Sequence, residues 1–204
     1  VATKINELRD SLTAAGENVI VVDAGDQFQG SLMYTTYKGA VEAEFMNAIG
    51  FDVMAVGNHE FDDGPSKLAE FIDAVDFPVI SGNLDVSQDD LLAGKVGNHV
   101  VLDVGGEKIG IISALAVDTV DTSSPGPNVI FQNEVDAIAA DVAALTDDGV
   151  SKIIALTHVG LPKDLEIASA VSGLDAVVGG HSHTYLSASD PKRAGAYPTY
   201  ASQE

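Results

Sequence analysis

Four short segments of the chain combine histidine, carboxylate or amide side chains with glycine, and each directly follows an apolar run. They span residues 23–30, 57–62, 157–160 and 179–183. The chain has five histidines, and four of them fall in these segments. Carboxylate and amide oxygens together with imidazole nitrogens form the mixed ligand set that binds Zn, Mn, Fe or Co. Such cations polarise a phosphoryl group and lower the pKa of a bound water, so the segments predict metal-assisted hydrolysis.

The candidate metal ligands comprise one carboxylate, one amide and three imidazoles: Asp26, Asn58, His158, His181 and His183. A carboxylate such as Asp26 can bridge two neighbouring cations. Each residue by itself also has a structural interpretation. Asp26 could end a turn, Asn58 could be a turn residue in the left-handed conformation, and His158 could be a structural histidine at a strand end. His181 and His183 would share one face of a regular strand, which suits two neighbouring metals or an ordinary polar edge. The four segments together favour the ligand interpretation.

The elements that must position these residues alternate between strand and helix. Apolar runs predict strands at 19–22, the one expected to be buried on both faces, and at 53–56, 78–80, 153–156 and 176–178. Helical spacing of apolar residues predicts helices at 5–12, 40–49, 65–75, 133–145 and 165–171, with Gly16, Pro65 and Asn133 as end signals. Residues 100–112 predict a hairpin with a Gly105-Gly106 turn.

This order predicts an α/β fold with a mostly parallel sheet and an antiparallel component from the hairpin. Because ligand sites in open α/β folds form at the carboxyl ends of strands, we expect the four segments to converge in space. The 204 residues suffice for one domain, or for one domain and part of another.

The composition excludes several functions. Ten Lys and Arg face 31 Asp and Glu, which gives a net charge of −21 and repels nucleic acid polymers and anionic lipid. The absence of cysteine excludes disulfides, thiolate chemistry and Cys-ligated zinc. No apolar run has the length of a membrane span. Acidic residues at 85, 89, 90, 118, 121, 147 and 148 are expected to form a solvated face.

Four motifs, in order, resemble signatures of the calcineurin-like metallophosphoesterases: Gly25-Asp26…Gly30, Gly57-Asn58-His59-Glu60-Phe61-Asp62, Thr157-His158-Val159-Gly160 and Gly180-His181-Ser182-His183. The chain is most similar to the branch that contains 5′-nucleotidases, UDP-sugar hydrolases and 2′,3′-cyclic-nucleotide phosphodiesterases. The resemblance implies a layered α/β/β/α sandwich with mixed sheets, two divalent metal ions and a small phosphate-ester substrate, most simply a nucleotide. It also implies a periplasmic or extracellular location.

The resemblance also implies a role for each matching residue. Asp26 would bridge both metals, and His183 would help to hold the first one. Asn58, His158 and His181 would complete the second metal site. His59 would stabilise the transferring phosphoryl group and protonate the leaving oxygen, with Asp62 orienting its ring.

One departure from the family pattern concerns the first metal site. The family opens with an Asp-x-His motif on its first strand, and this chain has none before Asp26. We therefore expect residues 1–204 to be an incomplete catalytic domain, without that strand and without a C-terminal nucleotide-binding domain. Such a fragment should hold one metal better than two and be weak or inactive by itself.

Two other functions fit the same motifs. A diverged domain of this type could bind metal or ligand at the cell surface or envelope without turnover. Alternatively, the substrate could be that of a thiosulfohydrolase-like enzyme or a general phosphodiesterase. A full gene that encodes Asp-x-His upstream of Val1 would favour the enzyme over the binding protein.

Several residues near the motifs receive structural interpretations. His99 lies in Gly97-Asn98-His99, which repeats the triplet at 57–59 but precedes a predicted strand, so we expect a structural or solvent-exposed histidine. Glu60 and Asp23 are expected to support their loops by local hydrogen bonds. For Phe28 and Phe61, core packing is at least as consistent with the sequence as a place at the site entrance, where Tyr185 could also lie.

Overall fold

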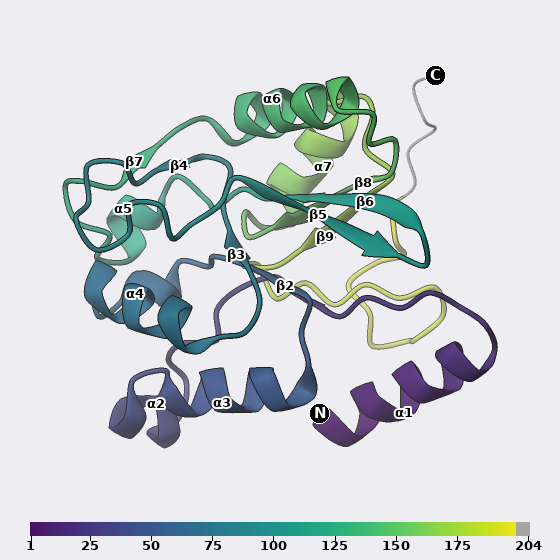
Figure 1. The fold of residues 1–204 in the computed structure, drawn as a ribbon, viewed down its shortest axis with the longest axis horizontal. Coiled ribbons are helices and arrows are strands. Elements are labelled where there is room, and N and C mark those ends of the chain that lie inside the picture. Colours follow the sequence, from purple (N-terminus) through teal and green to yellow (C-terminus); the bar gives the residue numbers. More distant parts are fainter. Residues whose placement is uncertain (199–204) are drawn as a thin grey trace.

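The computed structural model describes residues 1–198, so the last six residues of the expected 1–204 domain lie outside the described part. Two sheets lie against each other in the middle of the molecule (Figure 1). The first has the order β1-β2-β3 and is entirely parallel, with strands Val22–Asp23, Val53–Ala55 and Val79–Ile80. Its strands are short, and the central strand β2 is fully buried.

The second sheet has the order β5-β6-β8-β9, with strands His99–Val104, Glu107–Ile112, Ile153–Thr157 and Ala176–Gly179. Strands β5 and β6 form the predicted antiparallel hairpin, and Gly105 and Gly106 at its turn both have positive φ. The remaining neighbours are parallel. A separate antiparallel pair joins β4 (Leu84–Asp85) to β7 (Ile130–Phe131). The predicted combination of parallel and antiparallel strands is therefore confirmed.

Helices cover the outer face of each sheet (Figure 1). Helices α2 (Leu32–Tyr37), α3 (Ala40–Ile49) and α4 (Pro65–Ala74) lie on the side of the first sheet, whereas α6 (Glu134–Asp147) and α7 (Leu161–Ala170) lie on the other side. One apolar cluster packs under each helical layer. A third cluster, which includes Ala55, Ile80 and Leu156, fills the space between the sheets. These layers confirm the α/β/β/α sandwich.

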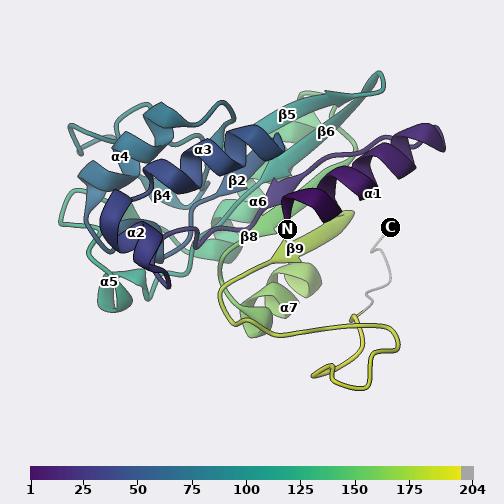
Figure 2. The same ribbon diagram turned by 90° about the horizontal axis from the view of Figure 1, so that it is seen from below.

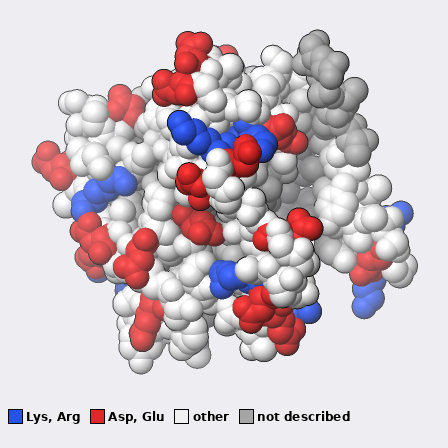
Figure 3. All heavy atoms as spheres, turned by 45° about the vertical axis from the view of Figure 1, so that its right-hand side comes forward, with Lys and Arg blue, Asp and Glu red and all other residues white. Residues whose placement is uncertain are grey.

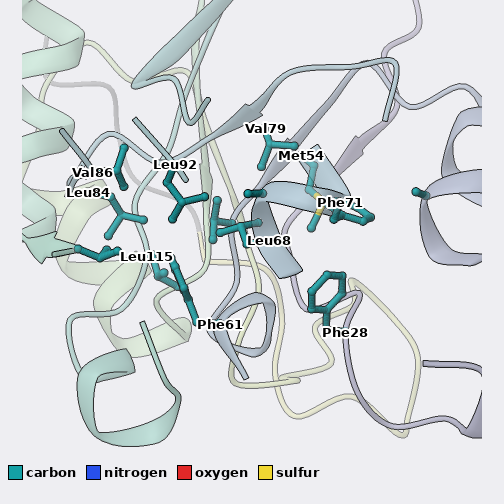
Figure 4. Packing of buried hydrophobic residues seen from close by; sticks show 14 of the residues in the cluster. Phe28, Met54, Phe61, Leu68, Phe71, Val79, Leu84, Val86, Leu92 and Leu115 are labelled. Carbon is teal, nitrogen blue, oxygen red and sulfur yellow. The ribbon is translucent and has the colours of Figure 1, made fainter. Parts of the chain in front are cut away.

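Aliphatic side chains and a few aromatic rings pack together in the core cluster to which α4 contributes Leu68 and Phe71 (Figure 4). The Phe28 and Phe71 rings meet edge to face with centroids 5.4 Å apart, and Phe61 has no exposed surface. Of the two places considered for Phe28 and Phe61, the structure shows core packing. Burying each such ring stabilises the fold by about 2–3 kcal/mol, so these residues secure the loops that carry them.

Helix α1 (Ala2–Ala14) ends as predicted, with Gly16 at φ +84°, but it has no buried residue. Seen from below in Figure 2, it lies in front of the sheets on the same side as α3, and Arg9 donates to the Gly50 carbonyl at the end of α3 at 2.8 Å. Its apolar stripe is consequently solvent-exposed, with Leu8 and Leu12 both more than two-fifths exposed.

Several boundaries differ from the sequence prediction for physical reasons. Strand β1 is shorter than 19–22 and only half-buried, because it is an edge strand with a single neighbour. Helix α7 begins at Leu161 rather than 165, since Pro162 is well placed in its first turn. Helices α2 and α5 (Thr119–Thr122) were not predicted, because six and four residues are too few to show a helical period.

Carboxylates are scattered over the face of the molecule shown in Figure 3, in keeping with the net charge of −21. For one residue of the expected solvated face the prediction is wrong. Asp89 is buried, and its Oδ1 accepts the backbone N–H groups of Leu91 and Leu92. Asp85 is half-buried, and the other five are exposed. Within residues 1–198, no helix has both the length and the apolar character needed to cross a bilayer.

Candidate metal centre

The four sequence segments converge where the carboxyl ends of the two sheets meet. Asp26 follows β1 and Asn58 follows β2, both in the first sheet, whereas His158 follows β8 and His181 follows β9 in the second. One ligand atom each from Asp26, His158 and His181 lie within 4.8 Å of one another. The expectation that the strand ends bring these side chains together is thereby met for this group.

Asn58 joins the same group through its side-chain oxygen. Its Oδ1 lies 2.9 Å from His181 Nδ1 and 3.2 Å from His158 Nε2. The Asn58 side chain is buried, and the His158 side chain is 1% exposed. Two oxygens and two imidazole nitrogens therefore point to one small volume, with Asn58 and His158 on its buried side and Asp26 and His181 half-buried.

The two nitrogens of His158 have different partners. Nδ1 lies 2.6 Å from the Ala24 carbonyl oxygen, which can only accept, so Nδ1 carries the proton. Nε2 lies 3.0 Å from Asp26 Oδ2 and 3.2 Å from Asn58 Oδ1. A neutral His158 therefore directs a lone pair at two oxygens that also carry lone pairs. A cation at this point, either a metal ion or a second proton on the ring, relieves that repulsion.

The charges of the group respond to one another. Burial opposes a charge on His158, but the hydrogen bond and negative charge of Asp26 outweigh it and raise the His158 pKa. Burial would raise the pKa of Asp26, and His158 together with the His59 backbone N–H lowers it instead. Burial, followed by the neighbouring His158, lowers the pKa of His181. Perturbed pKa values of this kind cluster at functional sites.

Backbone conformation at the site is unusual. Within residues 1–198, five non-glycine residues have positive φ, and three of them are candidate ligands: Asp26 at +64°, His181 at +74° and His183 at +51°. Such conformations cost free energy and occur preferentially at functional sites. His181 and His183 thus lie beyond β9 in irregular backbone, so the idea that they share one face of a strand is wrong.

Glu60 holds the Asp26 loop in place. Its carboxylate is fully buried and accepts the backbone N–H groups of Gly57, Asp26, Gln27 and Phe28. Burial raises its pKa to about 6, although the bonds from these N–H groups lower it. The expected supporting role is confirmed, and it extends beyond the local loop to residues 26–28. Asp23 likewise supports its loop, by accepting from Gly25 N and Gln27 Nε2.

Two glycines permit the close approach of these segments. A Cβ at Gly57 would lie 2.5 Å from the Asp26 backbone nitrogen and 2.7 Å from Glu60 Oε2. A Cβ at Gly180 would lie 3.0 Å from His158 Nδ1 and 2.9 Å from the Ala24 oxygen, the two atoms of the tautomer-fixing bond. Both positions therefore require the absence of a side chain.

His59 and Asp62 form a separate pair beside the cluster, at the two ends of the short 3₁₀ helix η1 (His59–Phe61), which His59 begins and Asp62 caps. His59 Nδ1 lies 2.6 Å from Asp62 Oδ2, and this hydrogen bond is the main cause of the raised His59 pKa. The His59 side chain is 44% exposed, so the ring can reach a molecule bound in front of it. Asp62 Oδ1 accepts from Ser123 Oγ at 2.7 Å. The sequence analysis missed Ser123 because it lies in a loop 61 positions away.

The remaining candidates lie at the margin. His183 is exposed and is not part of the compact ligand group, although it lines a cleft of about 1100 Å³ together with His181 and residues of α7 and β9. Tyr185 also lines this cleft, and its hydroxyl donates to Asp190. His99 lies away from the site at the start of β5, 3.3 Å from Asp141, which confirms its structural interpretation.

A layered α/β/β/α fold with carboxylate, amide and imidazole ligands at the ends of its strands defines the class of calcineurin-like phosphoesterases. Comparison with known families agrees: residues 2–185 match the family described as "Calcineurin-like phosphoesterase". The chain belongs to this family.

Individual relatives are 5′-nucleotidases. The chain is 47% identical over 187 residues to the 5′-nucleotidase of Diplobatis ommata, covering 90% of this chain and 32% of the relative. It is 40% identical to the snake venom 5′-nucleotidase of Naja atra, covering 97% of this chain and 38% of the relative. The chain thus spans about a third of the length of these relatives.

Solved structures show the same relationship. A 5′-nucleotidase precursor from Thermus thermophilus superposes with a TM-score of 0.89 at 41% identity, covering 93% of this chain and 38% of the other. The NAD nucleotidase of Haemophilus influenzae gives a TM-score of 0.86 at 37% identity, covering 93% of this chain and 37% of the other.

Proposed function

We propose that this chain is the central part of the catalytic domain of a metal-dependent phosphoric ester hydrolase that acts on nucleotides. The observation that carries the proposal is the orientation of His158. Its Nδ1 is committed to the Ala24 carbonyl, and its Nε2 faces Asp26 and Asn58 oxygens in a buried position. Outer partners of this kind fix the tautomer of metal-ligating histidines in many proteins.

The residues present fit a divalent cation of the Zn, Mn, Fe or Co type. Asp26, Asn58, His158 and His181 would hold one ion, and Asp26 with His183 would contribute to a second. When bound, the cations would polarise the phosphoryl group and lower the pKa of a bound water. The ion at Asp26 and His183, which corresponds to the first metal site of the family, is less completely provided for, because within the described residues only Asp26, His158 and His181 form a compact ligand group.

His59 would act on the leaving group. With Nδ1–H donated to Asp62, the opposite ring nitrogen is free to face the substrate. The hydrogen bond to Asp62 raises the His59 pKa, which favours the proton-donating form of the ring. His59 would give that proton to the leaving oxygen while the P–O bond breaks, and Asp62 would hold the ring in place.

The metal assignment is tested by calorimetry on the purified chain with Zn²⁺ or Mn²⁺. We expect one tight site, and we expect Asp26→Ala to abolish it. Asp90→Ala, at an exposed carboxylate, is the matched control and should bind like the wild type. Undiminished binding by Asp26→Ala would refute the assignment. Two tight sites on the wild-type chain would show that the first site is more complete than proposed.

The nucleotide substrate is supported by the relatives of the chain, which are 5′-nucleotidases and an NAD nucleotidase. Assays of the full-length protein with AMP, a 2′,3′-cyclic nucleotide and a UDP-sugar, each with added Mn²⁺ or Zn²⁺, separate the substrate classes. We expect AMP to be hydrolysed fastest. Metal binding without turnover of any of the three would favour the non-catalytic binding protein instead.

We further propose that a longer protein completes the site and that it acts outside the cytoplasm. A span of about a third of the relatives supports an additional first strand with Asp-x-His and a C-terminal nucleotide-binding domain. A relative from snake venom supports the location. Sequencing the parent gene and fractionating the cells test these two points. A parent that lacks Asp-x-His, or one retained in the cytoplasm, would contradict them.

A further inference from the structure

Ser123 completes a chain of hydrogen bonds that ends at His59. Its Oγ–H donates to Asp62 Oδ1 at 2.7 Å, and the other oxygen, Oδ2, lies 2.6 Å from His59 Nδ1. The three side chains therefore form one continuous line from the α5 loop to the candidate general acid. Within residues 1–198, each Asp62 oxygen has one of these two groups as its side-chain partner.

The surrounding structure fixes Ser123 in this place. It directly follows α5 in an extended conformation, with φ −147° and ψ −158°, and its backbone N–H donates to the Thr119 carbonyl. The next residues hold the loop against α4: Pro125 is buried, and Gly126 lies beside the Pro65 ring. The loop thus has support that does not depend on the bond to Asp62.

The neighbouring aspartate has a different set of partners. Asp63 accepts from the Tyr34 hydroxyl at 2.7 Å and from Lys38 Nζ at 2.9 Å, so it ties α2 to the end of η1. Two adjacent carboxylates therefore diverge, one toward α2 and one toward His59. Without a donor on Oδ1, the Asp62 carboxylate would be free to rotate about its side-chain bonds and leave the His59 ring.

We propose that Ser123 is a positioning residue that holds Asp62 in the orientation required by His59. The proposal rests on the proposed function, because His59 acts there as the proton donor to the leaving oxygen. Ser123 itself does not reach the substrate. Its bond to a carboxylate is charge-assisted, a class about twice as strong as a neutral hydrogen bond.

The first test observes His59 without any turnover. Protein labelled with ¹⁵N at histidine, without added metal, is compared as wild type and as Ser123→Ala by the ring ¹⁵N shifts at alkaline pH, where the ring is neutral. We expect the wild type to show the single tautomer with Nδ1 protonated and Ser123→Ala to show a mixture of both. An unchanged tautomer in Ser123→Ala would overturn the proposal.

The second test uses the leaving group in the full-length protein. A poor alkoxide leaving group, as in AMP, requires protonation, whereas 4-nitrophenolate departs without it. We expect Ser123→Ala to lower kcat for AMP roughly 10-fold with an unchanged KM, and to affect 4-nitrophenyl phosphate much less. An equal loss for both substrates would indicate a general structural defect and overturn the proposal.

Two variants complete the design. Ser123→Thr keeps the hydroxyl in an extended conformation that threonine tolerates, so it should restore most of the AMP activity. Ser124→Ala removes the adjacent exposed hydroxyl and should behave like the wild type. A wild-type protein without metal-dependent hydrolysis would refute the proposed function, while the tautomer measurement would still decide the role of Ser123.

Discussion

The triplet Gly-Asn-His occurs twice, at 57–59 and at 97–99, and the two copies occupy different surroundings. In the first, Asn58 is buried after β2 and its oxygen faces two histidines. In the second, Asn98 is exposed, and Gly97 pairs with the end of β3 through backbone hydrogen bonds to Val79 and Ser81. The place of a triplet relative to its strand therefore decides whether its side chains gather or disperse.

Each triplet also supplies a histidine that meets an aspartate through Nδ1. His59 lies 2.6 Å from Asp62, whose other oxygen is held by Ser123. His99 lies 3.3 Å from Asp141, whose other oxygen is buried without a partner among the described residues. The same two residue types thus form a short pair with both aspartate oxygens bonded in one place, and a longer pair with one aspartate oxygen unpartnered in the other; both pairs are partly buried. We relate the first to chemistry and the second to packing.

The largest expected difference between the two triplets is a difference in kcat, and it appears when the histidine of each triplet is substituted in turn. In the full-length protein, His59→Asn should lower kcat by roughly 10²- to 10⁴-fold, the usual contribution of a general acid. It should leave metal bound, because His59 is not a proposed ligand. His99→Asn should retain kcat, since its ring lies away from the site. Steady-state kinetics with elemental analysis checks both, and loss of metal from His59→Asn would show that its role is wrongly assigned.

The glycines of the two triplets provide a sharp contrast in stability. A Cβ at Gly57 would meet backbone at 2.5 Å, whereas a Cβ at Gly97 would lie 3.6 Å from its nearest atom, on the Ile80 side chain, which is an ordinary van der Waals distance. Gly57→Ala should therefore lower the free energy of unfolding by about 1–3 kcal/mol, the usual cost of forcing a methyl group into a packed site. Gly97→Ala should be close to neutral. Urea unfolding measures both, and equal effects would contradict the comparison.

The two asparagines should separate metal binding from folding. Asn58→Ala removes one of the four proposed ligand atoms, so we expect the calorimetric affinity for Zn²⁺ to fall roughly 10-fold. Asn98→Ala alters an exposed side chain and should leave the affinity unchanged. If both variants bind as tightly as the wild type, Asn58 is not a ligand.

The smallest expected effect concerns pH and the partner of His99. Burial raises the pKa of Asp141, although His99 lowers it in part. A carboxyl with a folded pKa above its unfolded value of about 3.9 makes the protein lose stability as pH rises from the unfolded value through the folded one. Asp141→Asn removes that loss, so its stability relative to wild type should increase from pH 3.5 to pH 7 in urea unfolding. If the difference in unfolding free energy between Asp141→Asn and wild type does not change with pH, the charge of Asp141 does not destabilise the fold.

The sequence predicts most of the fold because local patterns were strong. The fully buried β2 and the Asn133 cap, whose oxygen accepts the Asp136 N–H, were both recognisable from single segments. The prediction made the edge strand β1 too long, because an apolar run does not reveal how many neighbouring strands a strand has. Helix α2 was missed because six residues do not define a period.

The candidate site was predictable in its residue types but not in its connections. The convergence of Asp26 with His158 follows from the rule that strand ends meet at one edge of the fold. The contact of Ser123 with Asp62, and that of Glu60 with the 26–28 backbone, depend on how distant loops pack. No spacing in the sequence encodes such pairings. The strained conformation of His183, which leaves it exposed, was likewise invisible in a one-dimensional pattern.

The division of the proposed ligands between the two sheets has a mechanical consequence. Asp26 and Asn58 extend from one sheet, and His158 and His181 extend from the other. An ion bound by all four residues would cross-link the two sheets. Otherwise the sheets are held together by apolar packing between them, which includes Ala55 and Leu156. Removing the ion with a chelator would then weaken the contact between the sheets at the carboxyl ends of their strands, and amide hydrogen exchange in β2 and β8 would become faster in both strands together.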